Sequence, residues 1–350
     1  MKQNTIPVDG VSLDKSQLDL ALNASVTLTA TITPENATNK NVIWESDDSD
    51  VVSVDTDGNV TALSAGTAII TAITEDGLFT DQCEVTVDGD ETHDSVILDG
   101  LIYEIDHDSG SATVIGRDDS TIKDVSVPDT ITVDGDSYDV TAIDEEAFKM
   151  ESIKSIKIGS KVKSIGKHAF YMCKSLSSVT GGNNITTIEN GAFRMCSALK
   201  QIVIPANVTE IKYQTFSGCS VLEKVTFAGK KIKTIGDNAF YNCKKLKTIS
   251  TCENLVTIGV SAFENCASLS KFTITAKVRK ILMKAFKGCK ALKTFTFKGT
   301  SLTSVGQYAF QNVYSKVTFK IPSSKMSAYK KLIKKGNPPK KSKYSKLETK

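Results

Sequence analysis

The chain has 350 residues, 40% of them hydrophobic and 24% charged, the proportions of an ordinary globular protein with room for two or three domains. No apolar run reaches the roughly 18 residues that a membrane-spanning helix needs. The first residues show no apolar core of a secretory signal, so the chain is either intracellular or a mature or trimmed form whose signal has been removed.

The net charge of +3 conceals a strong asymmetry. Residues 1–145 carry 31 acidic side chains against 5 Lys and Arg, whereas residues 146–350 carry 9 against 38. Such a split favours contact of the basic half with a polyanion, or attraction within or between molecules. The alternative is that both halves are simply solvated.

Residues 6–88 alternate short apolar and polar runs. The pattern predicts strands at 26–32, 51–54, 69–73 and 83–87, separated by turn sequences such as Asp57-Gly58. Strands at intervals of about ten residues are typical of a small β-sandwich. Trp44, the single tryptophan, is predicted to be its central core aromatic residue.

Four motifs of this region occur together in one known family. They are Pro34-Glu35-Asn36-Ala37-Thr38, Trp44-Glu45-Ser46, the hairpin from Val54 to Ala62 and the strand from Gly66 to Ala72. In these motifs the region resembles the bacterial immunoglobulin-like domains of group 2, over nearly all of residues 6–88. We assign residues 1–88 to such a domain, and the resemblance implies an extracellular spacer or adhesion module.

The acidic loops of this domain offer weak metal signals. Asp55-Thr56-Asp57-Gly58-Asn59 begins like a calcium loop, but it lacks that loop's glycine spacing and terminal Glu, so we predict a plain hairpin turn. Asp47, Asp48 and Asp50 form a carboxylate cluster for which weak divalent binding stays open. His93, His107 and His168 are far apart in sequence and are interpreted as surface residues. We therefore predict no metal site and no cofactor.

Residues 89–95 are polar and are predicted to be a linker. Short alternating runs follow at 101–105, 112–115, 124–128 and 138–143. Because a solenoid must cover the exposed face of its first repeat, residues 96–145 are interpreted as cap strands.

The rest of the chain repeats one motif, I-G-x-x-A-F-x-x-C-x-x-L-x-x-I, at intervals of 22 to 24 residues. Its phenylalanines are Phe148, Phe170, Phe193, Phe216, Phe240, Phe263, Phe286 and Phe310. A period held over eight copies predicts a solenoid. The L-x-x-[VIF]-x-[IF] segment alternates with period two, which predicts one strand per turn and a parallel sheet with strands about 4.8 Å apart. The G-x-x-A-F-x-x-C segment is predicted to form one helical or 3-10 turn.

This frame closely resembles the BspA-like class of leucine-rich repeats over residues 96–322. The resemblance implies a right-handed solenoid with eight repeats over about 140–322, and a secreted or cell-surface bacterial protein that binds host proteins, matrix or other cells. The first repeat has Glu151, and the last has Val313, in place of the usual cysteine, as expected for terminal turns. The whole chain is thus predicted to be mainly β with short helices, an immunoglobulin-like sandwich followed by the solenoid.

Six cysteines recur at one position of the repeats: Cys173, Cys196, Cys219, Cys243, Cys266 and Cys289. Equivalent Cα atoms of neighbouring turns lie about 5 Å apart with parallel Cβ directions, which suits neither a disulfide nor four converging zinc ligands. We interpret the column as small apolar fillers with a weak S–H donor. Cys83 is predicted to be a buried free thiol, and Cys252, outside the column, to be exposed. All eight thiols are expected to be free.

The outward residues of the strands form the candidate ligand surface. Its members are Lys157, Thr180, Gln201, Lys224, Thr226, Thr248, Ser250, Lys271, Thr273, Thr294, Thr296, Thr318 and Lys320. The set lacks the Trp, Tyr and Arg anchors of typical protein hot spots. It indicates either strand propensity and solubility alone, or a broad, weakly basic docking surface.

Residues 323–350 carry 10 Lys and one acid. Met326, Tyr329, Leu332 and Ile333 have helical spacing, which predicts a cap helix over 324–335 that Gly336 ends, followed by a basic tail from Lys340. No base-reading motif is present, so we expect no specific nucleic-acid binding, and anionic polymers fit the charge better.

No catalytic motif is recognisable, and we predict a non-enzyme. The favoured function is that of a secreted or cell-surface binding or adhesion protein, which presents its repeat surface to host or envelope macromolecules. The alternative is an architectural cell-wall or spacer module that binds anionic envelope polymers. Neither reading requires a membrane span, and a monomer is expected.

Overall fold

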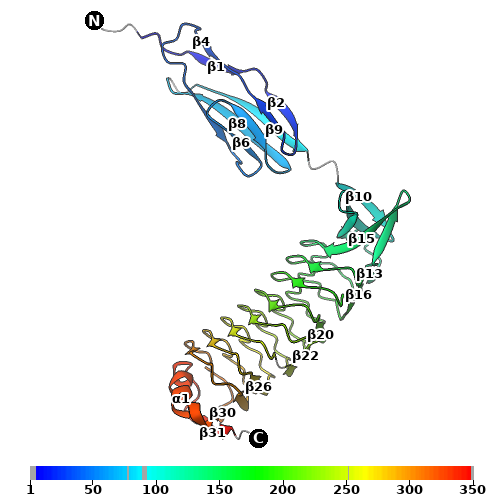
Figure 1. Cartoon of the computed structure of the whole chain (residues 1–350), viewed down its shortest axis with the longest axis vertical. Coiled ribbons are helices and arrows are strands. Elements are labelled where there is room, and N and C mark those ends of the chain that lie inside the picture. Colours follow the sequence, from blue (N-terminus) through cyan, green and yellow to red (C-terminus); the bar gives the residue numbers. More distant parts are fainter. Residues whose placement is uncertain (1–4, 77–78, 89–92, 251, 348–350) are drawn as a thin grey trace. The chain divides into compact units, whose positions relative to one another are not determined.

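The computed structural model describes residues 5–76, 79–88, 93–250 and 252–347. The chain divides into two compact units, Met1–Asp94 and Ser95–Lys350 (Figure 1). Each unit has its own hydrophobic core. Of the expected linker 89–95, residues 89–92 lie outside the described part, and residues 93–95 begin a strand.

In the described part of the first unit the regular elements are all strands. Their bounds are β1 Gly10–Leu13, β2 Gln17–Ala21, β3 Ser25–Thr27, β4 Ala30–Thr33, β5 Val42–Ser46, β6 Val52–Val54, β7 Asn59–Ala62, β8 Gly66–Thr74 and β9 Thr80–Asp88. A four-stranded sheet, β2-β9-β8-β5, and a three-stranded sheet, β3-β7-β6, form the unit together with the pair β1-β4. The fold is the predicted β-sandwich. The expected strand 26–32 is interrupted at Leu28, whose side chain is buried in the core.

Trp44 is not the central core residue that was expected. Its side chain is only half-buried, and the core consists of small aliphatic residues such as Val60, Ile70 and Val85. Trp44 lies on β5, the edge strand of its sheet, so neighbouring strands cover it on one side only. Its ring lies against the backbone of Gly58, where a Cβ atom would come within 2.8 Å of the indole. Gly58 has a φ of +83°, which favours glycine for a second reason.

The second unit opens with cap strands. Their bounds are β10 His93–Leu98, β11 Leu101–Asp106, β12 Ser111–Arg117, β13 Asp124–Ser126, β14 Thr130–Val133 and β15 Asp136–Ile143. Strands β10-β11-β12-β15 form one sheet that continues into the first turns of the solenoid, so the cap and the repeats share a single core.

Two ladders of parallel strands run along the solenoid, where the repeat pattern predicts one. The long ladder contains β16 Ser155–Ile158, β18 Ser178–Gly181, β20 Gln201–Ile204, β22 Lys224–Phe227, β24 Thr248–Ile249, β26 Lys271–Ile274, β28 Thr294–Phe297 and β30 Thr318–Pro322. The short ladder contains β17 Ser164–Ile165, β19 Thr187–Ile188, β21 Glu210–Ile211, β23 Thr234–Ile235, β25 Thr257–Ile258, β27 Lys280–Ile281 and β29 Ser304–Val305. With β13 in front and a final strand behind, the long ladder makes about ten turns.

The end of the solenoid differs from the expected basic tail. The 3-10 helix η1 (Ser323–Lys325) and helix α1 (Met326–Lys335) cover the last repeat through the buried side chains Tyr329 and Ile333. The chain then forms β31, Lys343–Leu347, which pairs in parallel with β30. Residues 343–347 of the presumed tail are therefore the last strand of the long ladder, and residues 348–350 lie outside the described part.

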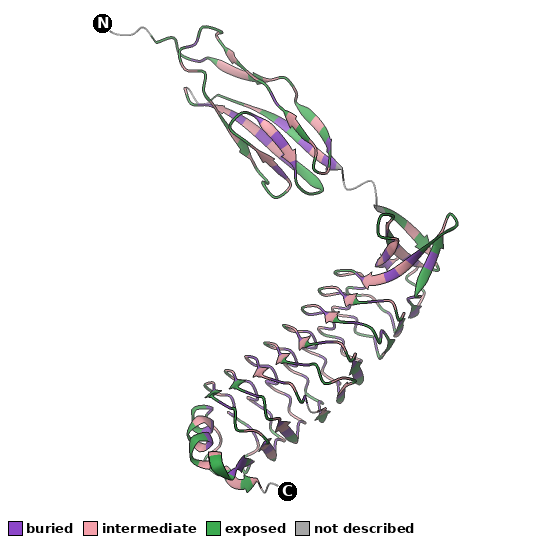
Figure 2. Cartoon of the chain, in the orientation of Figure 1, coloured by how far each residue is buried: buried purple, intermediate pink, exposed green. Residues whose placement is uncertain are grey.

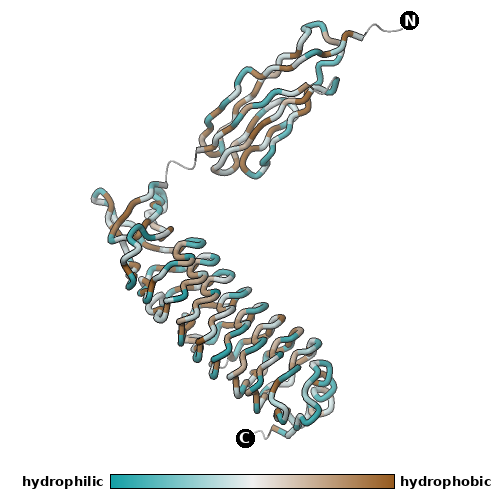
Figure 3. The backbone as a smooth tube through the Cα atoms, turned by 180° about the vertical axis from the view of Figure 1, so that it is seen from behind, coloured by the Kyte–Doolittle hydropathy of each residue, from teal (hydrophilic) through white to brown (hydrophobic). Residues whose placement is uncertain are grey.

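The repeat phenylalanines form a continuous stack inside the solenoid. All eight rings are buried, and neighbouring ring centroids lie 5.0–5.9 Å apart with interplanar angles of 4–10°. The same burial pattern recurs in each turn (Figure 2), and apolar and polar segments alternate along every turn (Figure 3). The rings and their aliphatic neighbours thus hold each turn against the next.

The G-x-x-A-F-x-x-C segment forms consecutive turns rather than a helical or 3-10 segment. Tyr171 N–H donates to His168 within its own repeat at 2.8 Å, while Phe170 N–H donates to Ala192 of the next repeat at 2.8 Å. Alternate N–H groups therefore join successive turns, which a helix could not allow. In each repeat two residues have left-handed φ values. They are the second residue before the phenylalanine and the second residue after it, for example Asn238 at 54° and Asn242 at 59°.

All eight cysteines are free and buried, and the six of the column line the inside of the turns as expected. Each column thiol donates to the carbonyl oxygen of the phenylalanine in the preceding repeat, at 2.8–3.2 Å. The prediction for Cys252 is wrong, because its side chain is only 6% exposed. Strand β24 ends at Ile249, so the alternation that placed Cys252 outside no longer holds three residues later.

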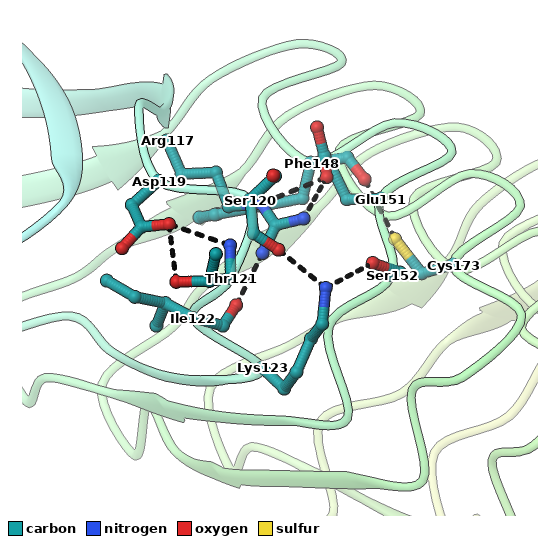
Figure 4. Close-up of polar contacts among 10 residues, drawn as sticks. All are labelled: Arg117, Asp119, Ser120, Thr121, Ile122, Lys123, Phe148, Glu151, Ser152 and Cys173. Atoms are coloured by element: carbon teal, nitrogen blue, oxygen red, sulfur yellow. Dashed lines mark hydrogen bonds and ion pairs between the residues drawn. The ribbon is translucent and has the colours of Figure 1, made fainter.

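An ion pair with a buried guanidinium joins the cap to the first repeat. Glu151 occupies the column position of the cysteines, and its Oε2 accepts a hydrogen bond of 2.9 Å from Nε of Arg117 on β12 (Figure 4). A second guanidinium nitrogen also donates to Glu151, and a third donates to the carbonyl of Ile122. The Arg117 side chain is 2% exposed and that of Glu151 35%. The atypical residue of the first turn is therefore the partner of a buried guanidinium.

Candidate functional site

The long ladder presents two rows of outward side chains, one from the first and one from the third residue of each strand, or, at β24, from the residue that follows the strand. The first row is Asp124, Ser155, Ser178, Gln201, Lys224, Thr248, Lys271, Thr294, Thr318 and Lys343. The second row is Ser126, Lys157, Thr180, Val203, Thr226, Ser250, Thr273, Thr296, Lys320 and Ser345. We call these two rows the outer face. All its residues are exposed or half-buried, because side chains alternate across a strand.

All thirteen residues of the expected ligand surface lie in these rows. Beyond these thirteen, the rows contain Ser155, Ser178 and Val203 and four residues of the terminal strands β13 and β31: Asp124, Ser126, Lys343 and Ser345. Val203 is 60% exposed, although the residues at the equivalent position of most other turns are polar. The signal for β31 was the alternation Lys343-Tyr344-Ser345, which the high lysine content of the segment obscured.

The long ladder is interrupted twice. Strands β18 and β20 are not paired, nor are β24 and β26. At the first break the short ladder is interrupted as well, between β19 and β21, whereas at the second break it continues. At the first break β18 ends in Gly181, where φ is +79° and a Cβ atom would lie 2.0 Å from the carbonyl oxygen of Ile158. At the second break β24 has only two residues. The backbone thus leaves the ladder early at both places.

A cavity opens at each break. The first has a volume of about 460 Å³ and a mainly apolar lining that includes Val179, Ile185, Ile202, Val203 and Pro205. The second has about 350 Å³, and four expected surface residues line it: Thr248, Ser250, Lys271 and Thr273. Cavities of this size can receive a side chain or a small ligand group. The outer face is therefore hollowed at two defined places.

One cluster of titratable groups outside the outer face has the composition of a metal site. The oxygen and nitrogen atoms of Glu145, Glu146 and His168 lie within 4.8 Å, a cluster that sequence spacing did not suggest. The two carboxylates already bind lysines, with Glu145 to Lys167 at 2.6 Å and Glu146 to Lys149 at 2.7 Å. A metal ion would have to displace both ammonium groups.

The acidic loops of the first unit direct their carboxylates toward the backbone. Asp55 accepts hydrogen bonds from the N–H groups of Asp57 and Asn59, both at 2.9 Å, in the turn between β6 and β7. Hydrogen bonds from Asn59 lower the pKa of Asp55. Asp48 accepts from the N–H of Asp50 at 3.1 Å. Weak divalent binding at Asp47, Asp48 and Asp50 remains a hypothesis.

The histidines are distributed as follows. His107 is exposed, with its Nδ1 2.8 Å from the Tyr138 hydroxyl, and His168 is half-buried. The side chain of His93 lies outside the described part. Among the described residues, no helix is long and apolar enough to cross a membrane.

The chain is similar to several bacterial proteins. One stretch of 155 residues is 34% identical to an uncharacterized protein of Clostridium acetobutylicum, and covers 43% of this chain and 15% of that protein. Another of 83 residues is 43% identical to an alpha-L-arabinofuranosidase of Bifidobacterium longum, over 24% of this chain and 8% of the enzyme. The chain thus spans 15% or less of the length of these relatives.

Solved structures with a similar fold include two leucine-rich repeat proteins. That of T. pallidum is 23% identical, with a TM-score of 0.49 over 57% of this chain and 91% of the other. A leucine rich cell surface protein of Faecalibacterium prausnitzii is 20% identical, with a TM-score of 0.46 over 72% of this chain and 95% of the other. At these values the likeness says nothing about ligands.

Family profiles match both units of the chain. Residues 7–85 match the bacterial Ig-like domain (group 2), which confirms the first resemblance. Residues 141–266 and 222–335 match the BspA type leucine rich repeat region, more than half of the chain. With its eightfold motif, phenylalanine stack and cysteine column, the chain belongs to the BspA type leucine-rich repeat family, with a group 2 Ig-like domain in front of the repeats.

Proposed function

We propose that this chain is a non-enzymatic binding protein of the bacterial cell exterior, and that its outer face docks a protein partner. The observation that carries the proposal is the first break of the long ladder. There an apolar cavity of about 460 Å³ adjoins Val203, whose side chain is 60% exposed. An exposed apolar residue beside a concave apolar lining is the arrangement into which a partner's aliphatic or aromatic side chain fits.

Other features support this proposal. Neighbouring outward residues, Thr180, Gln201 and Thr226, supply hydroxyl and amide groups that can form a polar rim around the cavity. The family membership and the Ig-like domain agree with a display role outside the cell. Export and surface attachment are part of the proposal.

The test is capture from serum and matrix proteins by the immobilised full chain, compared with Val203→Asp. The matched control is Ile97→Asp, which changes another exposed aliphatic residue, 55% exposed, on cap strand β10. We expect a partner that binds the native chain and the Ile97→Asp variant alike, and Val203→Asp at least about tenfold more weakly. Equal capture by all three chains would place binding elsewhere. Absence of any captured protein would favour the architectural alternative.

A further inference from the structure

The last turns of the solenoid carry positive charge without any carboxylate. Residues 265–347 contain 20 Lys and Arg and no Asp or Glu, whereas residues 146–264 contain 17 Lys and Arg and 8 acids. In the earlier turns acids pair with lysines of neighbouring turns, as Glu189 does with Lys212 and Glu223 with Lys247. In the described part of residues 265–347, Lys287 forms an ion pair of 2.9 Å with Glu264, an acid that lies just before this segment.

The outer face is also most regular in this region. Strands β26, β28, β30 and β31 form an uninterrupted four-stranded parallel sheet. In the first row Lys271, Thr294, Thr318 and Lys343 are in register, and in the second row Thr273, Thr296, Lys320 and Ser345. We call these eight residues the C-terminal face. At about 4.8 Å per strand, each row extends over roughly 14 Å.

The C-terminal face offers only two kinds of polar group. Three residues are exposed lysines, and the other five carry hydroxyls, so an anion would find ammonium groups flanked by hydrogen-bond donors. Two further exposed lysines, Lys293 and Lys316, lie shortly before strands β28 and β30. Lys320 and Lys343 lie on neighbouring strands, within the screening length of about 8–10 Å at moderate salt, whereas Lys271 lies roughly 14 Å from Lys343 along the first row. A polymer with repeated charges can span that distance.

We propose that the C-terminal face is a second binding site, distinct from the cavity beside Val203, and that it binds a flexible phosphodiester polymer without bases. Lysine binds phosphate as a point charge and does not impose the bidentate geometry of arginine. Arg279 is the sole arginine among the 20 cations of the segment, so charge density rather than shape selects the ligand. No aromatic residue belongs to the C-terminal face, so bases have no platform on which to stack.

The experiment measures binding of the full chain to poly(glycerol phosphate) from 50 to 300 mM salt. The test variant replaces Lys271, Lys320 and Lys343 by Thr, the residue that occupies neighbouring register positions and retains strand propensity. The control variant replaces Lys163, Lys233 and Lys244, three exposed lysines of earlier turns, also by Thr, so that net charge changes equally. A third variant replaces the same three lysines of the face by Arg.

We expect the native chain to bind with an affinity that falls steeply with salt. Each lost phosphate contact lowers the slope of log affinity against log salt by about 0.7, so the test variant should lose about 2 from the slope. It should bind at least about tenfold more weakly at the lowest salt, while the control and the Arg variant bind within about twofold to threefold of the native chain.

Three results would overturn the proposal. Binding that does not depend on salt, or no binding at low salt, would show that the C-terminal face is not an electrostatic site for the polymer. Equal losses in the test and control variants would show that net charge acts without a defined face. Tighter binding of single-stranded DNA than of the base-free polymer, at equal phosphate concentration, would assign the face to nucleic acid. Unchanged thermal unfolding of each variant confirms that folding is intact.

Discussion

The thiol of Cys266 donates a hydrogen bond of 3.2 Å to the carbonyl oxygen of Phe240 in the preceding repeat. The same oxygen accepts the N–H of Cys243 at 3.1 Å. One carbonyl therefore uses both lone pairs, one within its own turn and one toward the next. Because this arrangement recurs along the column, the cysteines contribute both volume and a directional contact between turns. A disulfide would remove that donor.

Replacing a column cysteine by alanine should weaken the stack of turns. In the native chain the thiol of Cys243 donates to the Phe216 carbonyl oxygen at 3.1 Å. The Cys243→Ala variant loses this donor, and a small cavity is left in a fully buried position. We expect the free energy of unfolding to fall by about 1–2 kcal/mol. Urea denaturation measures this, and Cys266→Ala should give a similar loss. A change below about 0.5 kcal/mol in both variants would contradict a structural role of the thiol.

The buried thiols predict a loss of stability at alkaline pH. Burial raises the pKa of Cys219 from its ordinary 9.0 to about 12. Below pH 9 the thiol is protonated in both folded and unfolded chains, and its contribution does not vary. Above pH 9 the unfolded chain releases a proton that the folded chain keeps, so the free energy of unfolding falls until about pH 12.

Each such thiol should contribute about 1.4 kcal/mol per pH unit to this decline. Urea midpoints between pH 8 and 11 measure it, and Cys219→Ala should flatten the curve by that amount relative to the native chain. Titration of thiols in denaturant without reductant should find about eight, and a count near two would contradict the free column. An identical pH dependence in the native chain and the variant would show that Cys219 does not couple to folding.

The parts of the fold that could be predicted are those that recur. Phe240, Cys243 and Leu246 face inward, and so do the residues at the equivalent positions of the other turns, because each turn must pass the same points. The spacing of these positions alone therefore predicted the solenoid and its core. The two left-handed residues per repeat also left a signal, since Gly218, Asn242 and Gly288 occupy one of these positions.

The features that could not be predicted depend on one turn only. The ladder breaks lie in the two repeats that lack the last apolar residue of the L-x-x-[VIF]-x-[IF] segment, at positions 181 and 251. The sequence marks these positions, but it does not show that strand pairing ends there. The burial of Cys252 follows from the second break. The candidate ligand surface was located because strand alternation places it, but the cavity beside Val203 required the three-dimensional path of the backbone.

The ion pair between Arg117 and Glu151 should be asymmetric in its response to mutation. Glu151→Ala leaves a guanidinium that is 2% exposed without its carboxylate, and we expect a loss of about 3 kcal/mol. Adding Arg117→Met removes the uncompensated charge and should restore most of that stability. Thermal unfolding of the two single variants and the double variant gives the coupling energy. A double variant less stable than Glu151→Ala would contradict this account.

Met150 offers a stabilising substitution. Its φ of 61° is left-handed, and its side chain is 64% exposed, so little packing is at stake. Its backbone N–H donates to Tyr171 at 2.7 Å, a bond that any residue other than proline retains. Asparagine stands at the equivalent position in three later repeats, Asn242, Asn265 and Asn312, all with left-handed φ.

Because asparagine tolerates this conformation better than methionine, Met150→Asn should raise the free energy of unfolding by about 0.5–1 kcal/mol. Urea denaturation measures the gain, and Met150→Val, whose branched side chain suits this φ worst, should lower stability instead. If both substitutions change stability equally, the left-handed backbone at this position is not what limits it.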